Sequence, residues 1–217
     1  MNIEVEFVKS AAGATDLPRD HLAELAMIGR SNVGKSSLIN ALVRQSVART
    51  SAAPGKTRLA NIYRVARGSS GPFYLVDLPG YGYARGGADG FARISEDYLC
   101  SRRGQAVLLL VDSRHPGLQS DREAWRWLKE TVETRAVVAT KIDKLARGER
   151  IRALRELQSV FDDPVLPVSA ATGEGLDELW KLIDRLANTP NLKKPRNRSR
   201  REETAPPAPP RGPRRKR

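Results

Sequence analysis

The sequence predicts an α/β fold in which a mostly parallel sheet of six to seven strands, one of them antiparallel, lies between layers of helices. Short apolar runs alternate with amphipathic stretches, which is typical of a parallel sheet covered on both faces. The runs have the length of strands, as in AVLLLV at residues 106–111. Two of the runs are joined by a link too short for a helix, so we expect an antiparallel hairpin there.

Seven strands follow one another along the chain, each rich in residues that favour extended structure. The third and fourth flank the short link ARGSSG and form the expected hairpin. The predicted strands are Ile3–Val8, Glu24–Ile28, Ala60–Val65, Phe73–Asp77, Ala106–Asp112, Arg135–Thr140 and Val165–Ser169.

Helices are expected after most of these strands, and the last helix has the clearest pattern. Its apolar residues recur at helical spacing with charged residues between them, so they should form one buried stripe. Trp180 belongs to this stripe and is therefore predicted to be a core residue. The stripe consists of Leu176, Leu179, Trp180, Ile183 and Leu186.

The helix around residues 123–132 contains two tryptophans that cannot share one face. Trp125, Leu128 and Val132 lie on a common side, and Trp127 does not. Two interpretations of Trp127 remain open: an exposed contact, or partial burial against a neighbouring loop.

The composition is that of a cytoplasmic protein with one folded domain. The chain has 217 residues, 40% of them hydrophobic, enough for one buried core. No apolar run approaches the roughly 18 residues of a membrane span, and the opening MNIEVEFV resembles a strand more than a signal peptide. Cys100 is the only cysteine, which excludes an internal disulfide and a cysteine-based zinc cluster.

The positive charge is concentrated at the C-terminal end. The chain has 38 Lys and Arg against 25 Asp and Glu, a net charge of +13, and residues 193–217 carry +9 of it. This segment is rich in Pro and Arg and has almost nothing apolar, so we predict a disordered tail after a folded domain at residues 1–192. Excess positive charge favours polyanionic partners such as RNA.

A phosphate-binding loop is predicted at GRSNVGKSS, residues 29–37. The segment matches G-x-x-x-x-G-K-[ST], follows a predicted strand and precedes an amphipathic helix, as that motif requires. Backbone N–H groups would converge on phosphate oxygens at the positive end of the helix. Lys35 would contact the β- and γ-phosphates, and Ser36 would bind Mg²⁺.

Two later strand ends carry residues suited to a guanine base. In TKID, residues 140–143, Asp143 can accept two hydrogen bonds from guanine, a donor pair that adenine lacks. The aliphatic stem of Lys141 would cover the base. In SAATGEG, residues 169–175, Ser169 would shape a turn and the N–H of Ala170 would donate to guanine O6.

The segment DLPG, residues 77–80, completes the phosphate end of the predicted site. Asp77 would hold Mg²⁺ through water, and the N–H of Gly80 can reach a γ-phosphate because no side chain blocks it. In the loop RTSAAPGKTRLAN, Thr57 is the candidate for a second hydroxyl on Mg²⁺ when the loop closes over a nucleoside triphosphate.

These segments together resemble the TrmE-Era-EngA-EngB-like GTPases, and within them the bacterial EngB/YihA/YsxC ribosome-biogenesis GTPases. GRSNVGKSSLIN, PGKTR, VDLPGYGYA, VDSRH, TKIDK and VSAATGEGLDEL carry the resemblance, which covers about residues 7–186. It implies a Ras-like G domain of the P-loop NTPase type, hydrolysis of GTP with Mg²⁺, and a role in large-subunit assembly and in septation and cell division. Thr140, where Asn is more general, looks like this subgroup's own form.

The resemblance places Tyr81 where Ras-like switches carry a water-positioning glutamine. Some related GTPases bind K⁺ instead, with an Asn in the phosphate loop as a ligand, and Asn32 matches that position. An Asn32 side chain that bonds its own loop backbone is an equal alternative. Without an arginine finger to neutralise charge, the intrinsic rate of GTP hydrolysis should be on the order of 10⁻⁴ to 10⁻³ per second.

The complete predicted site therefore has three parts. Lys35, Asn32 and Gly80 are the candidate catalytic residues, and Ser36, Thr57 and Asp77 are the candidate metal ligands. The nucleotide contacts are predicted to be Gly29, Arg30, Ser31, Asn32, Val33, Gly34, Lys35, Ser36, Ser37, Pro54, Gly55, Lys56, Thr57, Asp77, Leu78, Pro79, Gly80, Thr140, Lys141, Ile142, Asp143, Val168, Ser169 and Ala170.

Two functions from different classes fit the sequence. The first is a monomeric GTP-driven switch that docks on assembling large ribosomal subunits through rRNA, with GTP or GDP and Mg²⁺ bound and K⁺ as a further ion. The second is an RNA-binding protein whose affinity comes mainly from the basic tail, with a regulatory or residual nucleotide site. Intact Lys35, Ser36, Asp77 and Asp143 favour the first.

Overall fold

The computed structural model describes residues 2–13, 16–18, 20, 22–49, 59–68, 70–81, 93–101 and 105–187. Within these ranges it confirms the predicted α/β architecture and all seven strands. The predicted tail at residues 193–217 and the loop around Thr57 lie outside the described residues. The elements are β1 (Ile3–Ala11), β2 (Ala23–Gly29), α1 (Lys35–Val43), β3 (Ala60–Arg67), β4 (Ser70–Asp77), α2 (Arg93–Ser101), β5 (Ala106–Asp112), α3 (Gln119–Thr131), β6 (Thr134–Thr140), the 3₁₀ turn η2 (Ile142–Lys144), α4 (Arg147–Phe161), β7 (Val165–Pro167) and α5 (Leu176–Ala187).

The strands form one sheet in the order β1-β3-β4-β2-β5-β6-β7. β3 runs antiparallel to both of its neighbours, β1 and β4, and the pairs from β4 to β7 are parallel. One strand of seven is therefore antiparallel, as the short link in the β3–β4 hairpin predicts. The parallel strands β4, β2, β5, β6 and β7 consequently end at the same edge of the sheet.

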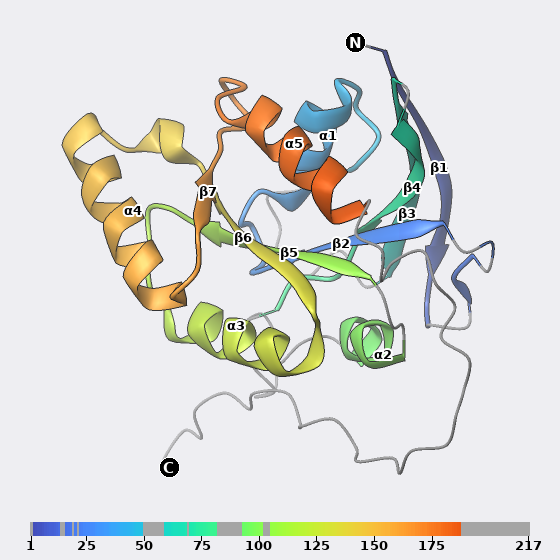
Figure 1. The fold of residues 1–217 in the computed structure, drawn as a ribbon, viewed down its shortest axis with the longest axis horizontal. Helices are drawn as coiled ribbons and strands as arrows, with labels where there is room; N and C mark the ends of the chain where they lie inside the picture. Colours follow the sequence, from blue (N-terminus) through green and yellow to red (C-terminus); the bar gives the residue numbers. More distant parts are fainter. Residues whose placement is uncertain are drawn as a thin grey trace.

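Helices cover both faces of the sheet, which gives three layers (Figure 1). Residues alternate along β2 and β5 between the two faces, because successive side chains of a strand point in opposite directions. Leu25 and Met27 pack with α1 and α5, while Ala26 and Ile28 pack with α2, α3 and α4. In the described part of the chain, none of the helices combines the length and the apolar character needed to cross a membrane.

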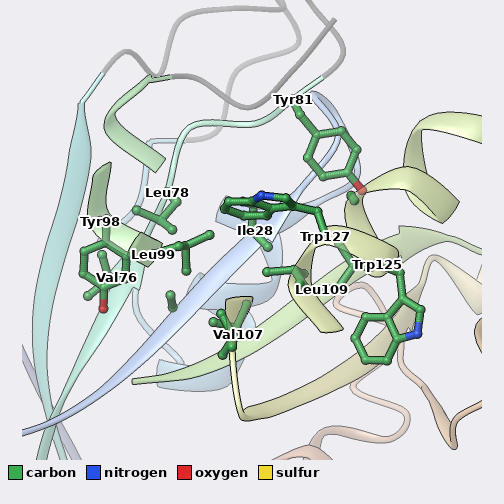
Figure 2. Packing of buried hydrophobic residues seen from close by; sticks show 14 of the residues in the cluster. Ile28, Val76, Leu78, Tyr81, Tyr98, Leu99, Val107, Leu109, Trp125 and Trp127 are labelled. Carbon is green, nitrogen blue, oxygen red and sulfur yellow. The ribbon is translucent and has the colours of Figure 1, made fainter. Parts of the chain in front are cut away.

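Trp127 is buried, with 3% of its surface exposed, so both interpretations drawn from the sequence are wrong. Helix α3 is covered on two sides. The indole N–H of Trp125 donates to the carbonyl of Phe161 at the end of α4, 2.8 Å away. Trp127 instead lies over the sheet near Ile28 and Leu109 (Figure 2). A pattern with a single buried face therefore underestimates the burial of a helix that packs against both a sheet and another helix.

Candidate nucleotide-binding site

The predicted site residues lie at the edge where the parallel strands end. Gly29 ends β2, Asp77 ends β4 and Thr140 ends β6, while Ser169 follows β7 by two residues. Ligands of open α/β sheets bind at this edge, where neighbouring connections leave in opposite directions. The topology thus brings together four motifs that lie between residues 29 and 175.

The phosphate loop turns sharply between β2 and α1. Asn32 and Gly34 both have left-handed backbone conformations, with φ of 64° and 106°. Alternation of this kind directs successive N–H groups toward one point and creates an anion-binding concavity. Helix α1 begins at Lys35, and the N–H of Leu38 donates to the Gly34 carbonyl at 2.8 Å. The N–H groups of the preceding turn have no intrahelical acceptor and are suited to phosphate oxygens.

Residues at the end of β6 donate hydrogen bonds to carbonyl oxygens of the phosphate loop. The Thr140 hydroxyl is buried and lies 2.7 Å from the Val33 carbonyl and 3.1 Å from that of Val111. The Lys141 ammonium donates to the Asn32 carbonyl at 2.5 Å. Thr140 therefore serves the site by connecting β6 to the phosphate loop, a role that its hydroxyl can perform without touching a base.

A pocket of about 350 Å³ lies between the phosphate loop and the β6 and β7 ends. Its lining combines apolar side chains with charged ones, as small-molecule sites commonly do. Its lining residues are Gly34, Ser37, Leu38, Thr140, Lys141, Asp143, Lys144, Val168, Ala170 and Ala171. The phosphate-loop, TKID and SAAT segments therefore share one cavity.

Asp143 is held in place by the turn after β7. The Ser169 hydroxyl donates to Asp143 Oδ1 at 2.6 Å and accepts from the N–H groups of Ala171 and Thr172. The hydrogen bond from Ser169 lowers the pKa of Asp143, and Lys144 lowers it further. Asp143 is thus an ionised acceptor at neutral pH, as recognition of guanine N–H groups requires.

Asp112 is a site residue that the sequence argument did not single out. Its carboxylate accepts two hydrogen bonds from the Arg114 guanidinium, at 2.9 and 2.8 Å, and one from the Lys141 ammonium at 2.9 Å. These donors outweigh the effect of burial and lower the pKa of Asp112 to about 2. Since Lys141 also bonds the Asn32 carbonyl, Asp112 fixes the side chain that is expected to cover the base. The position of Asp112 at the end of β5, next to β6, could have identified it as a site residue from the sequence.

Asp77 has the opposite environment. It is 2% exposed, and its Oδ1 has no hydrogen-bond partner in the part of the chain that the structure describes. The Lys35 ammonium is 3.9 Å from this oxygen, too far for a hydrogen bond. Burial raises the pKa of Asp77 to about 6, although Lys35 opposes the shift. A buried carboxylate oxygen without a donor is suited to a cation or to cation-bound water.

The residues at this end fit Mg²⁺. Ser36 lies in the first turn of α1, and Asp77 supplies the oxygen ligand that a hard cation prefers. The described residues contain no group of three or more His, Cys, Asp or Glu side chains that could hold a metal. Such a sparse site suits Mg²⁺, which keeps several waters and uses substrate phosphates as ligands.

Gly80 lies directly against the phosphate loop. A Cβ atom on this residue would be 2.9 Å from the Ser31 nitrogen and 3.0 Å from the Gly29 oxygen, so only glycine fits without displacing the backbone. The backbone of Tyr81 is bonded to the same loop on both sides. The Tyr81 side chain is 3% exposed and points into the core, so it does not face the pocket.

The remaining predicted contacts differ in position. The side chains of Leu78 and Ile142 are buried in the core and could reach a nucleotide only through their backbone. The carbonyl of Pro79 accepts a hydrogen bond from the Ser95 hydroxyl at 3.3 Å, which ties this segment to α2. Pro54, Gly55, Lys56 and Thr57 lie outside the described residues.

Residues 24–141 match the family described as 50S ribosome-binding GTPase. A probable GTP-binding protein EngB from Pelotomaculum thermopropionicum is 46% identical over 189 residues, which cover 83% of this chain and 93% of that protein. A second one, from Alkaliphilus oremlandii, is 40% identical over 199 residues, 88% of this chain and 94% of its own length.

Solved structures show the same fold. A crystal structure of a probable GTP-binding protein engB has a TM-score of 0.56 at 23% identity and covers 76% of this chain and 98% of that one. Era from Aquifex aeolicus bound to GDP and AlF₄⁻ has a TM-score of 0.65 at 23% identity, over 76% of this chain and 56% of that one.

We predict that Asp77→Asn stabilises the nucleotide-free protein by about 1–3 kcal/mol, because it removes a buried charge whose Oδ1 accepts no hydrogen bond from the described residues. Urea denaturation at pH 7.5 measures the effect, with the exposed Asp163→Asn as the control variant. Because the folded pKa of Asp77 is raised to about 6, the wild-type protein gains stability as pH falls through 6 and its carboxylate takes up a proton. The advantage of the variant should therefore shrink at pH 5. A stability loss at pH 7.5 would show that the Asp77 charge is well compensated.

We predict that Asp143→Asn weakens binding of GDP by two to four orders of magnitude, about 3–6 kcal/mol for two charge-assisted hydrogen bonds. An amide can accept from N1–H of xanthine and donate to its C2 carbonyl, so affinity for XDP should rise. Fluorescent nucleotide titrations measure both affinities. Asp162→Asn, at the exposed end of α4, is the matched control and should change neither. Unchanged GDP affinity in Asp143→Asn would contradict the assignment.

Proposed function

This chain belongs to the EngB family of GTPases, and from that membership we propose that it is a nucleotide-dependent switch in the assembly of the large ribosomal subunit. It binds guanine nucleotides and hydrolyses GTP. The observation that carries the proposal is the shared pocket in which Asp143 faces the phosphate loop. The description of the matched family as ribosome-binding supports the choice of partner.

The residues have separate roles in this proposal. Asp143 and the Ala170 N–H select guanine, and Lys141 covers the base. Lys35 contacts the β- and γ-phosphates, while Ser36, Asp77 and Thr57 hold Mg²⁺. Mg²⁺ neutralises charge on the phosphates when bound, and its presence in the solved complex of Era with MgGDPNP supports its use here.

Hydrolysis is proposed to be slow without a partner. The residue after Gly80 points its side chain into the core, so Tyr81 does not position the attacking water. Phosphoryl transfer then depends on the charges and N–H groups of the loop. Asn32, exposed at the tip of the phosphate loop, is proposed as a ligand for K⁺.

The partner is proposed to be the large subunit or its assembly intermediates, contacted through rRNA by a monomer in the cytoplasm. An Era structure contains nucleotides 1506–1542 of 16S rRNA, which supports RNA as a partner of this fold. The folded domain at residues 1–192 would provide the regulated contact. The alternative function, RNA binding driven by the tail, is favoured by the charge of +9 that residues 193–217 carry.

We predict that a variant ending at Leu192 still co-sediments with large ribosomal subunits in a non-hydrolysable GTP analogue and not in GDP. The closed loops of the folded domain would make the contact in the triphosphate state. The full-length chain should show the same dependence on the nucleotide but remain bound at higher salt concentrations, because its tail adds contacts to RNA phosphates. Loss of binding of the shortened chain in both nucleotides would favour the alternative function. Equal binding in both would contradict the switch.

We predict that GTP hydrolysis is at least several-fold faster in KCl than in NaCl at equal ionic strength. A K⁺ ion near the β- and γ-phosphates would stabilise charge that develops in the transition state. Asn32→Gly, which can keep the left-handed backbone of this residue, should reduce the difference between the rates in KCl and NaCl. Release of phosphate in single-turnover reactions measures this effect. Equal wild-type rates in the two salts would exclude the K⁺ role.

A further inference from the structure

Tyr81 is fixed at three points around the phosphate end of the site. Its N–H donates to the Gly29 carbonyl at 3.2 Å, and its carbonyl accepts from the Ser31 N–H at 3.2 Å. Its hydroxyl donates to Asp121 Oδ1 at 2.8 Å. The backbone bonds join Tyr81 to the phosphate loop, and the side-chain bond joins it to helix α3. The residue therefore connects two elements that are far apart in the sequence.

The side chain of Tyr81 lies between the sheet and α3 (Figure 2). It stands next to the indole of Trp127, and its hydroxyl is directed toward the helix. Burial is the largest cause that raises the pKa of Tyr81 well above its ordinary value, and the Asp121 charge adds to it. The hydroxyl thus stays protonated and remains a donor throughout the neutral range.

Burial of the Asp121 carboxylate at this position has a high free-energy cost. It lies in the first turn of α3 and is only 1% exposed. An ionised carboxylate at such depth costs several kcal/mol unless donors and positive charge compensate it. Burial raises the pKa of Asp121 to about 6, although the hydrogen bond from the Tyr81 hydroxyl and the charge of the Arg30 guanidinium oppose the shift. An apolar pair would fill the space at lower cost, so a purely packing role does not account for the carboxylate.

The position of Gly80 depends on these contacts. Gly80 is enclosed between the Ser31 nitrogen and the Gly29 oxygen, where even a Cβ atom would clash. Because Tyr81 is the next residue, a rotation of its peptide would move the Gly80 backbone within this narrow space.

We propose that Tyr81 and Asp121 are positioning residues that hold Gly80 at the γ-phosphate end of the site by connecting it to α3. The inference rests on the proposed role of the Gly80 N–H toward the γ-phosphate. It adds the side-chain pair that fixes this N–H and names α3 as the element to which it is fixed. Both side chains are buried, and neither lines the pocket.

The same core contains a matched pair for comparison. The Tyr98 hydroxyl on α2 donates to Glu24 Oε2 on β2 at 2.7 Å, and Tyr98 is as deeply buried as Tyr81. Tyr98→Phe therefore removes a tyrosine–carboxylate hydrogen bond of similar length from a tyrosine of the same hydrophobic cluster, with a carboxylate that is half-buried where Asp121 is buried. It lies away from the phosphate loop, so it reports the cost in stability without the effect on positioning.

We predict that Tyr81→Phe lowers the affinity for a non-hydrolysable GTP analogue about tenfold and changes the affinity for GDP less than twofold. The rate of GTP hydrolysis should also fall about tenfold at saturating GTP, because the N–H of Gly80 is less well placed. Tyr98→Phe should keep the wild-type ratio of the two affinities. Asp121→Asn retains an oxygen that accepts from Tyr81, so this conservative variant should stay within about twofold of wild type.

Fluorescent nucleotide titrations, single-turnover hydrolysis and urea denaturation of the full-length variants test this proposal. An unchanged affinity ratio in Tyr81→Phe, or an equal change in Tyr98→Phe, would overturn it. A comparison of wild-type protein with Gly80→Ala tests the role of Gly80 toward the γ-phosphate separately from the positioning role of Tyr81 and Asp121. If Gly80→Ala lowers affinity for the GTP analogue and Tyr81→Phe does not, only the inference fails. If wild-type protein and Gly80→Ala show the same ratio, the role of Gly80 itself fails.

Discussion

The phosphate loop depends on donors that its neighbours supply to its carbonyl oxygens. A loop that turns its N–H groups toward a ligand must turn carbonyl groups away from it, and each of these needs a donor when buried. The Tyr81 N–H serves Gly29, the Lys141 ammonium serves Asn32, and the Thr140 hydroxyl lies against Val33. The donors come from the ends of β4 and β6. The loop is therefore shaped by the whole sheet edge as well as by its own glycines.

Buried carboxylates in this region differ by the number of donors they receive. Asp112 accepts from Arg114 and Lys141, and its pKa falls to about 2, so it is a stable anion that orients a lysine. Asp77 has an oxygen without a partner, and burial raises its pKa to about 6. The number of donors therefore distinguishes the carboxylate that orients a lysine, Asp112, from the carboxylate proposed to bind a cation, Asp77. Asp112 is compensated within the protein, whereas the partnerless oxygen of Asp77 is left available to a cation at a cost in stability.

Sequence patterns predicted the elements and motifs because those depend on local spacing. The seven strands, the antiparallel β3 and the apolar stripe of α5 follow from periodicity and link length, although Leu176 and Leu186 of the stripe are only partly buried. The convergence of the TKID and SAAT segments on the phosphate loop followed from parallel strands ending at one edge. The direction of the Tyr81 side chain, the burial of Trp127 and the link from Asp112 to Lys141 could not be predicted. Each depends on how α3 or a neighbouring strand is placed, which involves contacts between residues tens of positions apart.

The segment from Asp112 to Asp121 connects the two halves of the site. At its start, Asp112 bonds Lys141 beside the base pocket, and the Ser113 hydroxyl donates to the Thr140 carbonyl at 2.6 Å. At its end, Asp121 bonds Tyr81 beside the phosphate loop. Only the short connection between β5 and the first turn of α3 separates these contacts. Both ends of this segment are buried and hydrogen-bonded, so a shift of α3 would strain the bond between Asp121 and Tyr81 and would pull on the connection to Asp112. The base half and the phosphate half thus share one support, which lies on the face of the sheet opposite α1.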